Sequence, residues 1–415
     1  MDEVIIVGAG IGGLTLALAL HRVGISSHVY EAAPEIRPIG VGINLLPHAT
    51  RELSRLGLEA ELAGVAVATR EAVFFNRFGQ LIYREPLGKN AGYEWPQFSI
   101  HRADLQHVLL NALRQRIGEE RIHLGWNCLG FVQDSAGVTA RFRSTTDGAE
   151  LPAQRGSVLV ACDGLHSVVR RQLHPAEGEP LYSGVNMWRG VTRWPTILSG
   201  ASMIRAGWLA QGKMVIYPIR DRIDREGRQL VNWVAEIETP RHPDRDWNRV
   251  GRLEDFIAAF EDWRFEWLDV PRFIRAADTI LEFPMIDQDP LPWWSEGRVT
   301  LLGDAAHPMV PRGSNGAGQA ILDAGALADC LAAGADRVAA LKTYEERRLG
   351  PTADVVRMSR TNPPDAILRE VYQRTGDRPF TRIEDVISVA ELSALSEGYK
   401  RVAGYDRESL RGGAR

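Results

Sequence analysis

Cysteine is scarce in this sequence, and long apolar runs are missing from it. The 415 residues include three cysteines, Cys128, Cys162 and Cys330, which lie far apart and are odd in number. This spacing gives neither a disulfide framework nor a set of metal ligands, so we expect reduced cysteines and no metal site. No stretch of about 18 apolar residues occurs, and the sequence therefore predicts no membrane-spanning helix.

Charge of one sign is not in excess either. The formal net charge of −4 and the lack of a lysine or arginine run argue against a general nucleic-acid binder. The first apolar run begins at Val4, which leaves no room for a cleaved targeting peptide. We therefore expect a cytoplasmic enzyme with no nucleic-acid or membrane partner, and the sequence leaves open whether it is a monomer or a homodimer.

The N-terminal segment carries a dinucleotide-binding pattern. Val4–Val7 has the apolar, β-branched composition of a buried parallel strand. Three glycines in G-x-G-x-x-G spacing follow it, namely Gly8, Gly10 and Gly13. The first allows a tight turn, the second lets the backbone approach a pyrophosphate, and the third lets the next helix pack close to the strand.

A helix and a second strand complete this βαβ unit. The helix is predicted from Ile11 to about Val23, with its N-terminal N–H groups directed at the phosphates. The second strand, Ser27–Tyr30, ends at Glu31, at the distance from the glycines where an acidic side chain binds a ribose hydroxyl. The combination predicts a dinucleotide site, with a glycine-rich turn in a purely structural βαβ unit as the alternative.

Further patterns predict an α/β fold in which a sheet domain is inserted into a discontinuous nucleotide-binding domain. Residues 181–238 hold alternating runs such as "MVIYPI" and "QLVNWVAEI", which are typical of a mixed or antiparallel sheet. The expected helices are Pro47–Leu56, His101–Gly118 and Arg252–Phe265, and the expected strands include Ala72–Tyr83 and Ser157–Gly164. The predicted nucleotide-binding domain comprises residues 1–71, 99–180 and 281–375, the predicted substrate domain 72–98 and 181–280, and a C-terminal extension 376–415.

Two more motifs follow apolar strands. Gly303-Asp304 comes directly after one strand and precedes a loop rich in glycine and proline, and then an Ala-rich helix. A carboxylate there can accept a hydrogen bond from a polyol hydroxyl, and the loop offers N–H donors to an electron-rich ring edge. Asp163-Gly164 lies in "ACDGLHSVVR". Each motif alone is compatible with an ordinary strand–helix turn, but the three in this order are far more specific.

Together these motifs resemble the FAD-dependent aromatic monooxygenases of the para-hydroxybenzoate hydroxylase type, the single-component class A flavoproteins. The resemblance is carried by "GAGIGG", "DGLHSVVR" and "GDAAHPMVPRGSNGAGQAILDA". Within the family, the chain is most similar to the phenazine-modifying monooxygenase of pyocyanin synthesis, through "EIRPIGVGINLLP", "FSIHRADLQ", "MWRGVT", "GRLEDF" and "DPLP". The family fold is a Rossmann-like FAD-binding domain with an inserted mixed or antiparallel β-sheet substrate domain and C-terminal helices.

The resemblance implies FAD as cofactor. Glu31 would bind the adenosine ribose and Asp304 the ribityl chain. In residues 311–317, the flavin loop, Pro311 and the backbone of Gly313–Ala317 would lie against the isoalloxazine. Many relatives carry Gly-Gly-Gln-Gly-x-Asn in this loop, whereas this chain reads "GSNGAG", so that Asn315 replaces the usual Gln. The expected FAD-binding residues are Gly8, Gly10, Ile11, Gly12, Gly13, Glu31, Ala32, Arg37, Gly42, Arg102, Gln106, Asp163, Gly164, Gly303, Asp304, Pro311, Gly313, Ser314, Asn315, Gly316 and Ala317.

The same resemblance implies the course of the reaction. NAD(P)H reduces FAD, reduced FAD captures O₂, and a flavin C4a-hydroperoxide delivers oxygen to the substrate. No second G-x-G-x-x-G fingerprint is present, as in class A enzymes, where the reductant visits without a domain of its own. No side chain is assigned a catalytic role, because the cofactor carries the chemistry.

The substrate site is expected between the flavin loop and the inserted sheet. Aromatic and Met side chains there could stack on a planar substrate, although ordinary sheet core is the alternative for each. The candidate walls are Met187, Trp188, Arg189, Trp208, Tyr217, Trp233, Pro284 and Met285. The cations that could hold a substrate carboxylate, or lie on a solvated strand face, are Arg189, Arg205, Lys213 and Arg220.

The predicted activity is NAD(P)H-consuming hydroxylation of a small aromatic or N-heteroaromatic compound, phenazine-like and carboxylated or not. One alternative on the same scaffold is inactivation of an antibiotic such as a tetracycline or a rifamycin. Another is a non-catalytic protein that contains FAD and binds an aromatic ligand. The sequence leaves NADH and NADPH undistinguished.

Overall fold

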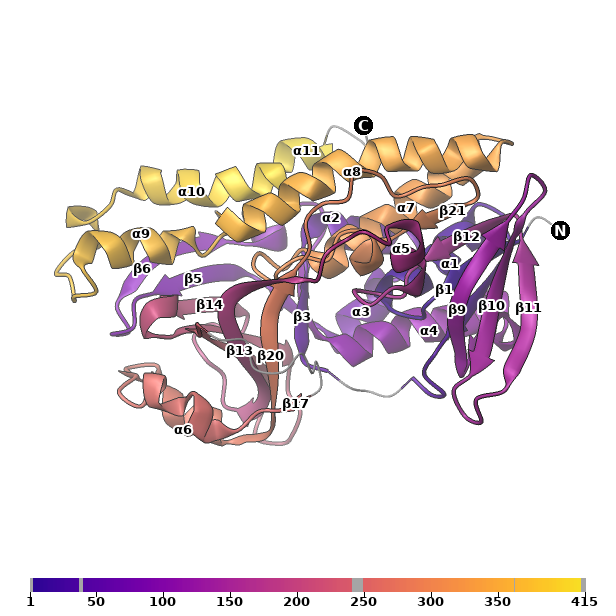
Figure 1. Cartoon of the computed structure of the whole chain (residues 1–415). Coiled ribbons are helices and arrows are strands. Elements are labelled where there is room, and N and C mark those ends of the chain that lie inside the picture. Colours follow the sequence, from indigo (N-terminus) through magenta and orange to yellow (C-terminus); the bar gives the residue numbers. More distant parts are fainter. Residues whose placement is uncertain (1–2, 37–39, 241–248, 362, 412–415) are drawn as a thin grey trace.

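The computed structural model describes residues 3–36, 40–240, 249–361 and 363–411 (Figure 1). A parallel sheet with the strand order β21–β12–β1–β2–β8 forms the core of the nucleotide-binding part. Its strands are β1 (Val4–Val7), β2 (Ser27–Glu31), β8 (Ile122–Leu124), β12 (Val158–Ala161) and β21 (Val299–Leu301). All residues of β1 and β12 are buried, because a parallel sheet is covered on both faces.

Helices and a small antiparallel sheet enclose this parallel sheet. Helix α1 packs between α4 and α7, and the β9–β11 sheet stands at the end of the molecule near the N-terminus (Figure 1). The helices of this part are α1 (Ile11–Arg22), α2 (Pro47–Arg55), α3 (Glu59–Val65), α4 (Arg102–Ile117), α5 (Val168–Leu173), α7 (Gly316–Ala333) and α8 (Arg337–Thr361). The small sheet contains β9 (Trp126–Gln133), β10 (Val138–Ser144) and β11 (Glu150–Gly156).

The parallel arrangement brings the three sequence motifs together. Strands β1, β12 and β21 are neighbours and run in the same direction, so their carboxyl ends lie on one edge of the sheet. Gly8 directly follows β1, and Asp163 and Gly303 lie two positions after the last residues of β12 and β21. Ligands of open α/β sheets bind at this edge, and the motifs therefore converge on one place.

The second large element is a mixed sheet with the order β17–β20–β13–β16–β15–β14–β5–β6. Strands β14 and β5 pair in parallel, and the other neighbours pair antiparallel, as the alternating runs predicted. Its strands are β5 (Glu71–Phe75), β6 (Leu81–Pro86), β13 (Leu181–Trp194), β14 (Ser202–Gly207), β15 (Lys213–Arg220), β16 (Gln229–Glu238), β17 (Arg249–Val250) and β20 (Ala277–Asp287). The predicted α/β class with an inserted mixed sheet is confirmed, and β20 runs across the domain boundary proposed at residue 281.

One expected helix of this part is not formed. Residues 252–265 contain two short 3₁₀ turns, Leu253–Asp255 and Ile257–Phe260, and the start of a small hairpin, β18 (Arg264–Phe265) with β19 (Leu268–Asp269). Phe256, Phe260 and Trp263 are buried in the apolar cluster on one face of the mixed sheet, together with apolar residues of α6 (Val270–Arg275). This packing overrides the local helical preference.

A third, small sheet and the C-terminal helices complete the molecule. Strands β3 (Gly42–Leu45), β7 (Gln97–His101) and β4 (Val67–Thr69) form the small sheet. Helices α9 (Ala366–Thr375) and α10 (Val389–Val402) lie against β5 and β6, and α11 (Arg407–Arg411) follows (Figure 1). No helix within the described ranges is both long and apolar enough to cross a membrane.

Candidate functional site

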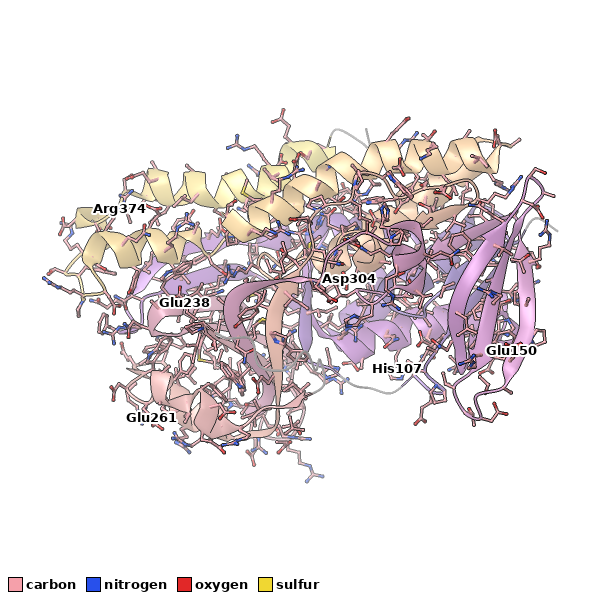
Figure 2. All side chains as sticks on the ribbon, in the orientation of Figure 1. His107, Glu150, Glu238, Glu261, Asp304 and Arg374 are labelled. Atoms are coloured by element: carbon pink, nitrogen blue, oxygen red, sulfur yellow. The ribbon has the colours of Figure 1, made fainter. Side chains whose placement is uncertain are left out.

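A cavity of about 500 Å³ lies where the carboxyl edge of the parallel sheet meets the mixed sheet. Figure 2 shows Asp304 near the middle of the molecule, between these two parts. One wall comes from the three strand ends and from the start of α7, and the opposite wall from β13 and β20. The predicted site residues that line this cavity are Gly10, Ile11, Gly12, Arg102, Gly164, Met187, Arg189, Pro284, Gly303, Asp304, Pro311, Gly316 and Ala317.

The three glycines after β1 are required for different structural reasons. A Cβ atom on Gly13 would lie 2.0 Å from the carbonyl oxygen of Gly8, so only glycine lets α1 pack this close to β1. Gly8 itself has a φ of 103°, a backbone conformation that favours glycine. A Cβ atom on Gly10, in contrast, would meet no protein atom within 4 Å. Gly10 therefore presents bare backbone to the open cavity, as close approach of a pyrophosphate requires.

Two predicted side chains hold the turn beside these glycines. Glu31 Oε2 accepts a hydrogen bond of 2.7 Å from the Ala9 N–H, and Gln106 Nε2 donates one of 2.9 Å to the Ala9 carbonyl. The other carboxylate oxygen of Glu31 accepts from the N–H of Ala33, next to the exposed Ala32. Glu31 and Gln106 thus both hold the Ala9 peptide, next to the cavity-lining Gly10.

Several expected FAD-binding residues are not among those that line the cavity, namely Gly8, Gly13, Glu31, Ala32, Gly42, Gln106, Asp163, Gly313, Ser314 and Asn315. Arg37 lies outside the described residues. Gly42 is packed against the mixed sheet, where its N–H donates to Asn232 Oδ1 over 2.7 Å. A Cβ atom on Gly42 would lie 2.7 Å or less from side chains of that sheet, so this glycine serves the contact between β3 and the sheet.

Asp304 offers its carboxyl group to the cavity. The side chain is accessible from the cavity, while the surrounding walls raise its pKa by desolvation and His307 opposes this effect. The turn that carries Asp304 is fixed from behind by Asp323, which accepts from the Gly303 N–H at 3.1 Å and contacts His307 Nε2 at 2.5 Å. A carboxyl group held in this way fits a polyol chain such as the ribityl group.

Asp323 is a functional residue that the sequence analysis missed. It is fully buried on α7, and Arg348 of α8 donates to its Oδ1 over 2.7 Å. Burial works against its ionisation, but the contacts with His307 and Arg348 hold the pKa of Asp323 below its ordinary value. An aspartate inside an apolar helical run was the signal that could have identified it.

The Asp-Gly motif after β12 is tied to the same turn. Asp163 Oδ2 accepts from the Val168 N–H at 3.0 Å, at the start of α5, and its buried Oδ1 has no partner among the described residues. Arg170 of α5 is buried and donates to the carbonyls of Ala305 and Ala306, each over 2.9 Å. The segment that follows Asp163-Gly164 therefore positions the Gly303-Asp304 turn.

The flavin loop has two unlike faces. Pro311, Gly316 and Ala317 line the cavity, and the N-terminus of α7 points there with its free N–H groups. The side chain of Asn315 is buried on the other face, where Oδ1 is 3.1 Å from His48 Nε2 and Nδ2 donates to the Tyr399 hydroxyl over 2.8 Å. Asn315 is therefore an anchor of the loop, which differs from the expected contact with the cofactor.

The structure divides the predicted substrate walls between the two faces of the mixed sheet. Met187, Arg189 and Pro284 line the cavity. Trp188 and Trp233 point to the opposite face, where Trp188 stacks on Phe256 with ring centroids 5.0 Å apart. Because side chains of a strand alternate, Trp188 between the cavity-lining Met187 and Arg189 faces away from the cavity. Trp233 is buried in the same cluster as Trp188, and the expectation is corrected for both tryptophans.

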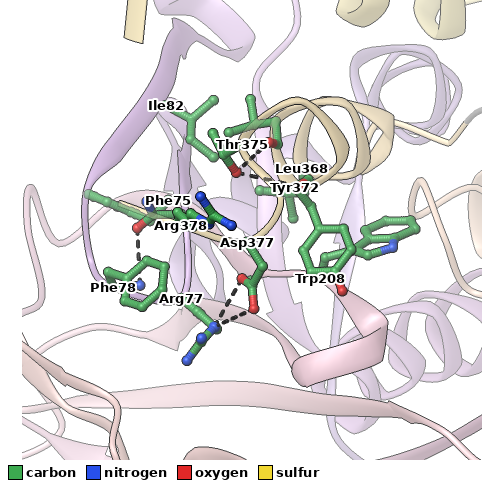
Figure 3. Close-up of a pocket in the computed structure, with 13 residues that line it drawn as sticks. Phe75, Arg77, Phe78, Ile82, Trp208, Leu368, Tyr372, Thr375, Asp377 and Arg378 are labelled. Carbon is green, nitrogen blue, oxygen red and sulfur yellow. Dashed lines mark hydrogen bonds and ion pairs between the residues drawn. The ribbon is translucent and has the colours of Figure 1, made fainter. Parts of the chain in front are cut away.

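The remaining wall candidates are also set back from the cavity. Tyr217 is buried and donates to the Gly42 carbonyl over 2.8 Å, and Met285 is buried in one cluster with Met187 and Val310. Trp208 lines a separate pocket of about 20 Å³ beside α9, shown in Figure 3. That pocket has room for about one water molecule, so it is no substrate site. Wall residues that the sequence analysis missed include Ile43, Cys162, Leu281, Phe283 and Ile286.

The four candidate cations are in different situations. Arg205 and Lys213 are buried and form ion pairs with Asp365, and Arg220 pairs with Asp104. Arg189 lines the cavity, donates from Nη2 to the Gly42 carbonyl over 2.7 Å, and has no ion pair with a carboxylate in the part of the chain that the structure describes. Its Nε is buried without a partner there, and desolvation lowers the pKa of its guanidinium.

Comparison with known proteins finds FAD-binding relatives over nearly the whole chain. Residues 1–269 and 281–359 match the family model of the FAD binding domain. The chain is 40% identical to the phenazine 1,6-dicarboxylic acid hydroxylase of Lysobacter antibioticus, over 96% of this chain and 97% of that protein. It is 37% identical to a 3-amino-4-hydroxybenzoate 2-monooxygenase of Streptomyces platensis, over 94% and 95%. The fold is similar to that of a Klebsiella pneumoniae HpxO variant crystallised with FAD, with a TM-score of 0.77, 25% identity and 99% of each chain covered.

Proposed function

The chain belongs to the class A flavin monooxygenase family, and we propose that it hydroxylates a small, phenazine-like aromatic carboxylate with NAD(P)H as reductant and O₂ as co-substrate. FAD is the cofactor, as the three motifs predicted, and the cavity residues fit it. Neither antibiotic inactivation nor a non-catalytic binding role is favoured by any feature of the cavity.

The single observation that carries the substrate class is the state of Arg189. It is a cation on the cavity wall formed by the mixed sheet, and its Nε is unpartnered among the described residues. A guanidinium in a desolvated site gains a charge-assisted, two-point contact when a carboxylate enters. Both relatives compared above are named for aromatic carboxylic acids, which agrees with this expectation.

The residues of this chain would bind, orient and shield the reactants. Gly10 and the start of α7 would hold the phosphates and the ring edge of FAD, and Asp304 its ribityl chain. When bound, FAD supplies the hydroxylation chemistry. Met187, Leu281 and Phe283 form an apolar wall that would exclude water from the reacting centre, while Arg189 would fix which edge of the substrate faces the cofactor.

Turnover with a matched pair of substrates tests this proposal. Purified FAD-loaded protein is mixed with NADH or NADPH and with phenazine-1-carboxylate or unsubstituted phenazine, and products are identified by mass spectrometry. We expect substrate-stimulated NAD(P)H oxidation and a hydroxylated product, with the carboxylate preferred. If no aromatic carboxylate in a wider panel stimulates NAD(P)H oxidation, the proposed function is wrong.

The variant Arg189→Gln tests the carboxylate contact separately. A lost hydrogen bond to a charged group should raise KM for the carboxylate by about tenfold to a hundredfold. The control is Arg220→Gln, because Arg220 pairs with Asp104 and does not line the cavity. An unchanged KM in Arg189→Gln would mean that another group holds the carboxylate.

A further inference from the structure

We infer that Tyr399, on the C-terminal helix α10, is a positioning residue for the flavin loop. The Tyr399 hydroxyl accepts a hydrogen bond of 2.8 Å from Asn315 Nδ2 and donates one of 3.4 Å to the carbonyl of Arg312. Two loop residues are thus held by one side chain that is distant in sequence. This inference rests on FAD as the cofactor and is independent of the identity of the substrate.

Asn315 uses its whole hydrogen-bonding capacity at this contact. An asparagine side chain offers two N–H donors and an oxygen that accepts two bonds. Nδ2 donates to Tyr399 and to the Gly313 carbonyl, over 2.8 and 3.1 Å, and Oδ1 accepts from His48 Nε2 and Gln319 Nε2, over 3.1 and 3.3 Å. The pKa of His48, lowered to about 4 by burial, keeps its ring neutral at neutral pH. Because the amide oxygen of Asn315 can only accept, the single ring proton of His48 lies on Nε2 in this contact. Tyr399 is the partner that comes from outside the nucleotide-binding part.

The backbone next to Asn315 needs such support. Gly313 has a φ of 85° and Ser314 a φ of 59°, which is an unfavourable conformation for a residue with a Cβ atom. Strained residues of this kind persist where the surrounding structure over-determines them. A Cβ atom on Gly313 would lie 1.9 Å from the Tyr399 hydroxyl oxygen, so the loop rests directly on the tyrosine.

Tyr399 is itself held rigidly. It is buried at 1% exposure, and burial raises the pKa of its phenol, so the hydroxyl stays protonated and can donate and accept together. The neighbouring Lys400 forms a buried ion pair of 2.9 Å with Glu85 of β6, and Ser396 donates to the same carboxylate. Helix α10 therefore connects the flavin loop to the mixed sheet through its contacts with both.

The loop residues that line the cavity lie directly beside this anchor. Pro311 and Gly316 flank the anchored segment Arg312–Asn315 on either side. Without the Tyr399 hydroxyl, Asn315 Nδ2 loses a partner in a buried site, and the loop can shift with the N–H groups that face FAD. The consequence should appear in the binding and the spectrum of FAD more than in the stability of the fold.

The variant Tyr399→Phe tests this inference, with Tyr83→Phe as the matched control. The Tyr83 hydroxyl also contacts α10, at Ser393, but on the side that faces β6. FAD binding to the apoprotein is followed by quenching of FAD fluorescence, the bound flavin by its visible absorption, and the apoprotein by its Tm. We expect Tyr399→Phe to raise the Kd for FAD about tenfold and to alter the visible band, with a Tm equal to that of the control.

Two outcomes would overturn the inference. One is an FAD affinity and spectrum of Tyr399→Phe equal to those of Tyr83→Phe. The other is a lower Tm with unchanged FAD binding, which would give Tyr399 a structural role alone. If Tyr399→Phe fails to fold, Asn315→Ala removes the same hydrogen bond from the loop side and should weaken FAD binding at least as much, because it also removes the bonds to His48, Gly313 and Gln319. Where both single variants fold, the double variant should bind FAD no worse than Asn315→Ala alone, and additive losses would contradict the coupling.

Discussion

At the scale of single residues, the site depends on carboxyl groups that the fold holds in unlike states. Asp304 faces the cavity and has a raised pKa, whereas Asp323 behind it is held ionised by His307 and Arg348. One carboxyl group is thus left for a ligand, and the other holds the turn. The sequence motif identified the first, because Gly-Asp follows a strand, but not the second, whose partners come from another helix.

Replacement of Asp304 by alanine should weaken FAD binding. A buried hydrogen bond to a charged group contributes about 1.5–3 kcal/mol, so the Kd for FAD should rise about tenfold or more. Equilibrium titration of the apoprotein measures this, with Asp278→Ala on the exposed face of β20 as control. FAD retention equal to that of the control would remove Asp304 from the cofactor site.

His48 gives the protein a pH dependence with a defined sign. Its pKa is lowered by burial from 6.5 to about 4, so the unfolded chain binds a proton between these values that the folded chain does not. The free energy of unfolding should therefore rise with pH from 4 to 6.5, by about 3 kcal/mol from this group. Urea unfolding at pH 5 and pH 7 measures the slope. In His48→Gln, which keeps a neutral donor, the slope should become shallower, and an unchanged slope would assign it to other groups.

At the scale of elements, two glycines of one motif make opposite predictions. Gly13→Ala would place a Cβ atom 2.0 Å from the Gly8 carbonyl and force α1 away from β1. Overpacking of this kind should lower the free energy of unfolding by about 2 kcal/mol or more. Gly10→Ala meets no protein atom within 4 Å, so its apoprotein should be as stable as the wild type while FAD binding is lost. Urea unfolding and FAD titration of both variants check the pair, and equal effects on both readouts would contradict the assignment.

Individual elements also show which structural features can be predicted from the sequence. Strand β1, helix α1 and the three motifs were predicted because their signals are local. The face that each strand turns to the cavity was not predicted. Met187 and Trp188 are neighbours on β13, and tertiary packing decides that Trp188 joins the apolar cluster with residues 256–274 while Met187 lines the cavity. The contact between Asn315 and Tyr399 joins residues that are 84 positions apart, so no local sequence pattern predicts it.

At the scale of the whole molecule, the cavity belongs to neither sheet alone. One wall comes from the parallel sheet and the other from β13 and β20, so a substrate between them contacts both parts of the chain. We expect a true substrate to speed the reduction of bound FAD by NAD(P)H, because a ligand shifts the population toward the arrangement it binds better. Anaerobic stopped-flow absorption measures the rate. Equal reduction rates with and without a substrate that is demonstrably hydroxylated would refute this coupling.

The anchoring of the flavin loop by α10 has a consequence for biosynthesis. The glycine motif after β1 leaves the ribosome early, but the loop that faces the flavin ring receives its Tyr399 contact only when residues near position 400 have been made. A nascent chain that has already folded its parallel sheet would therefore hold an incomplete cofactor site. Translation that stops before α10 should release a protein that has the intact dinucleotide fingerprint but binds FAD weakly.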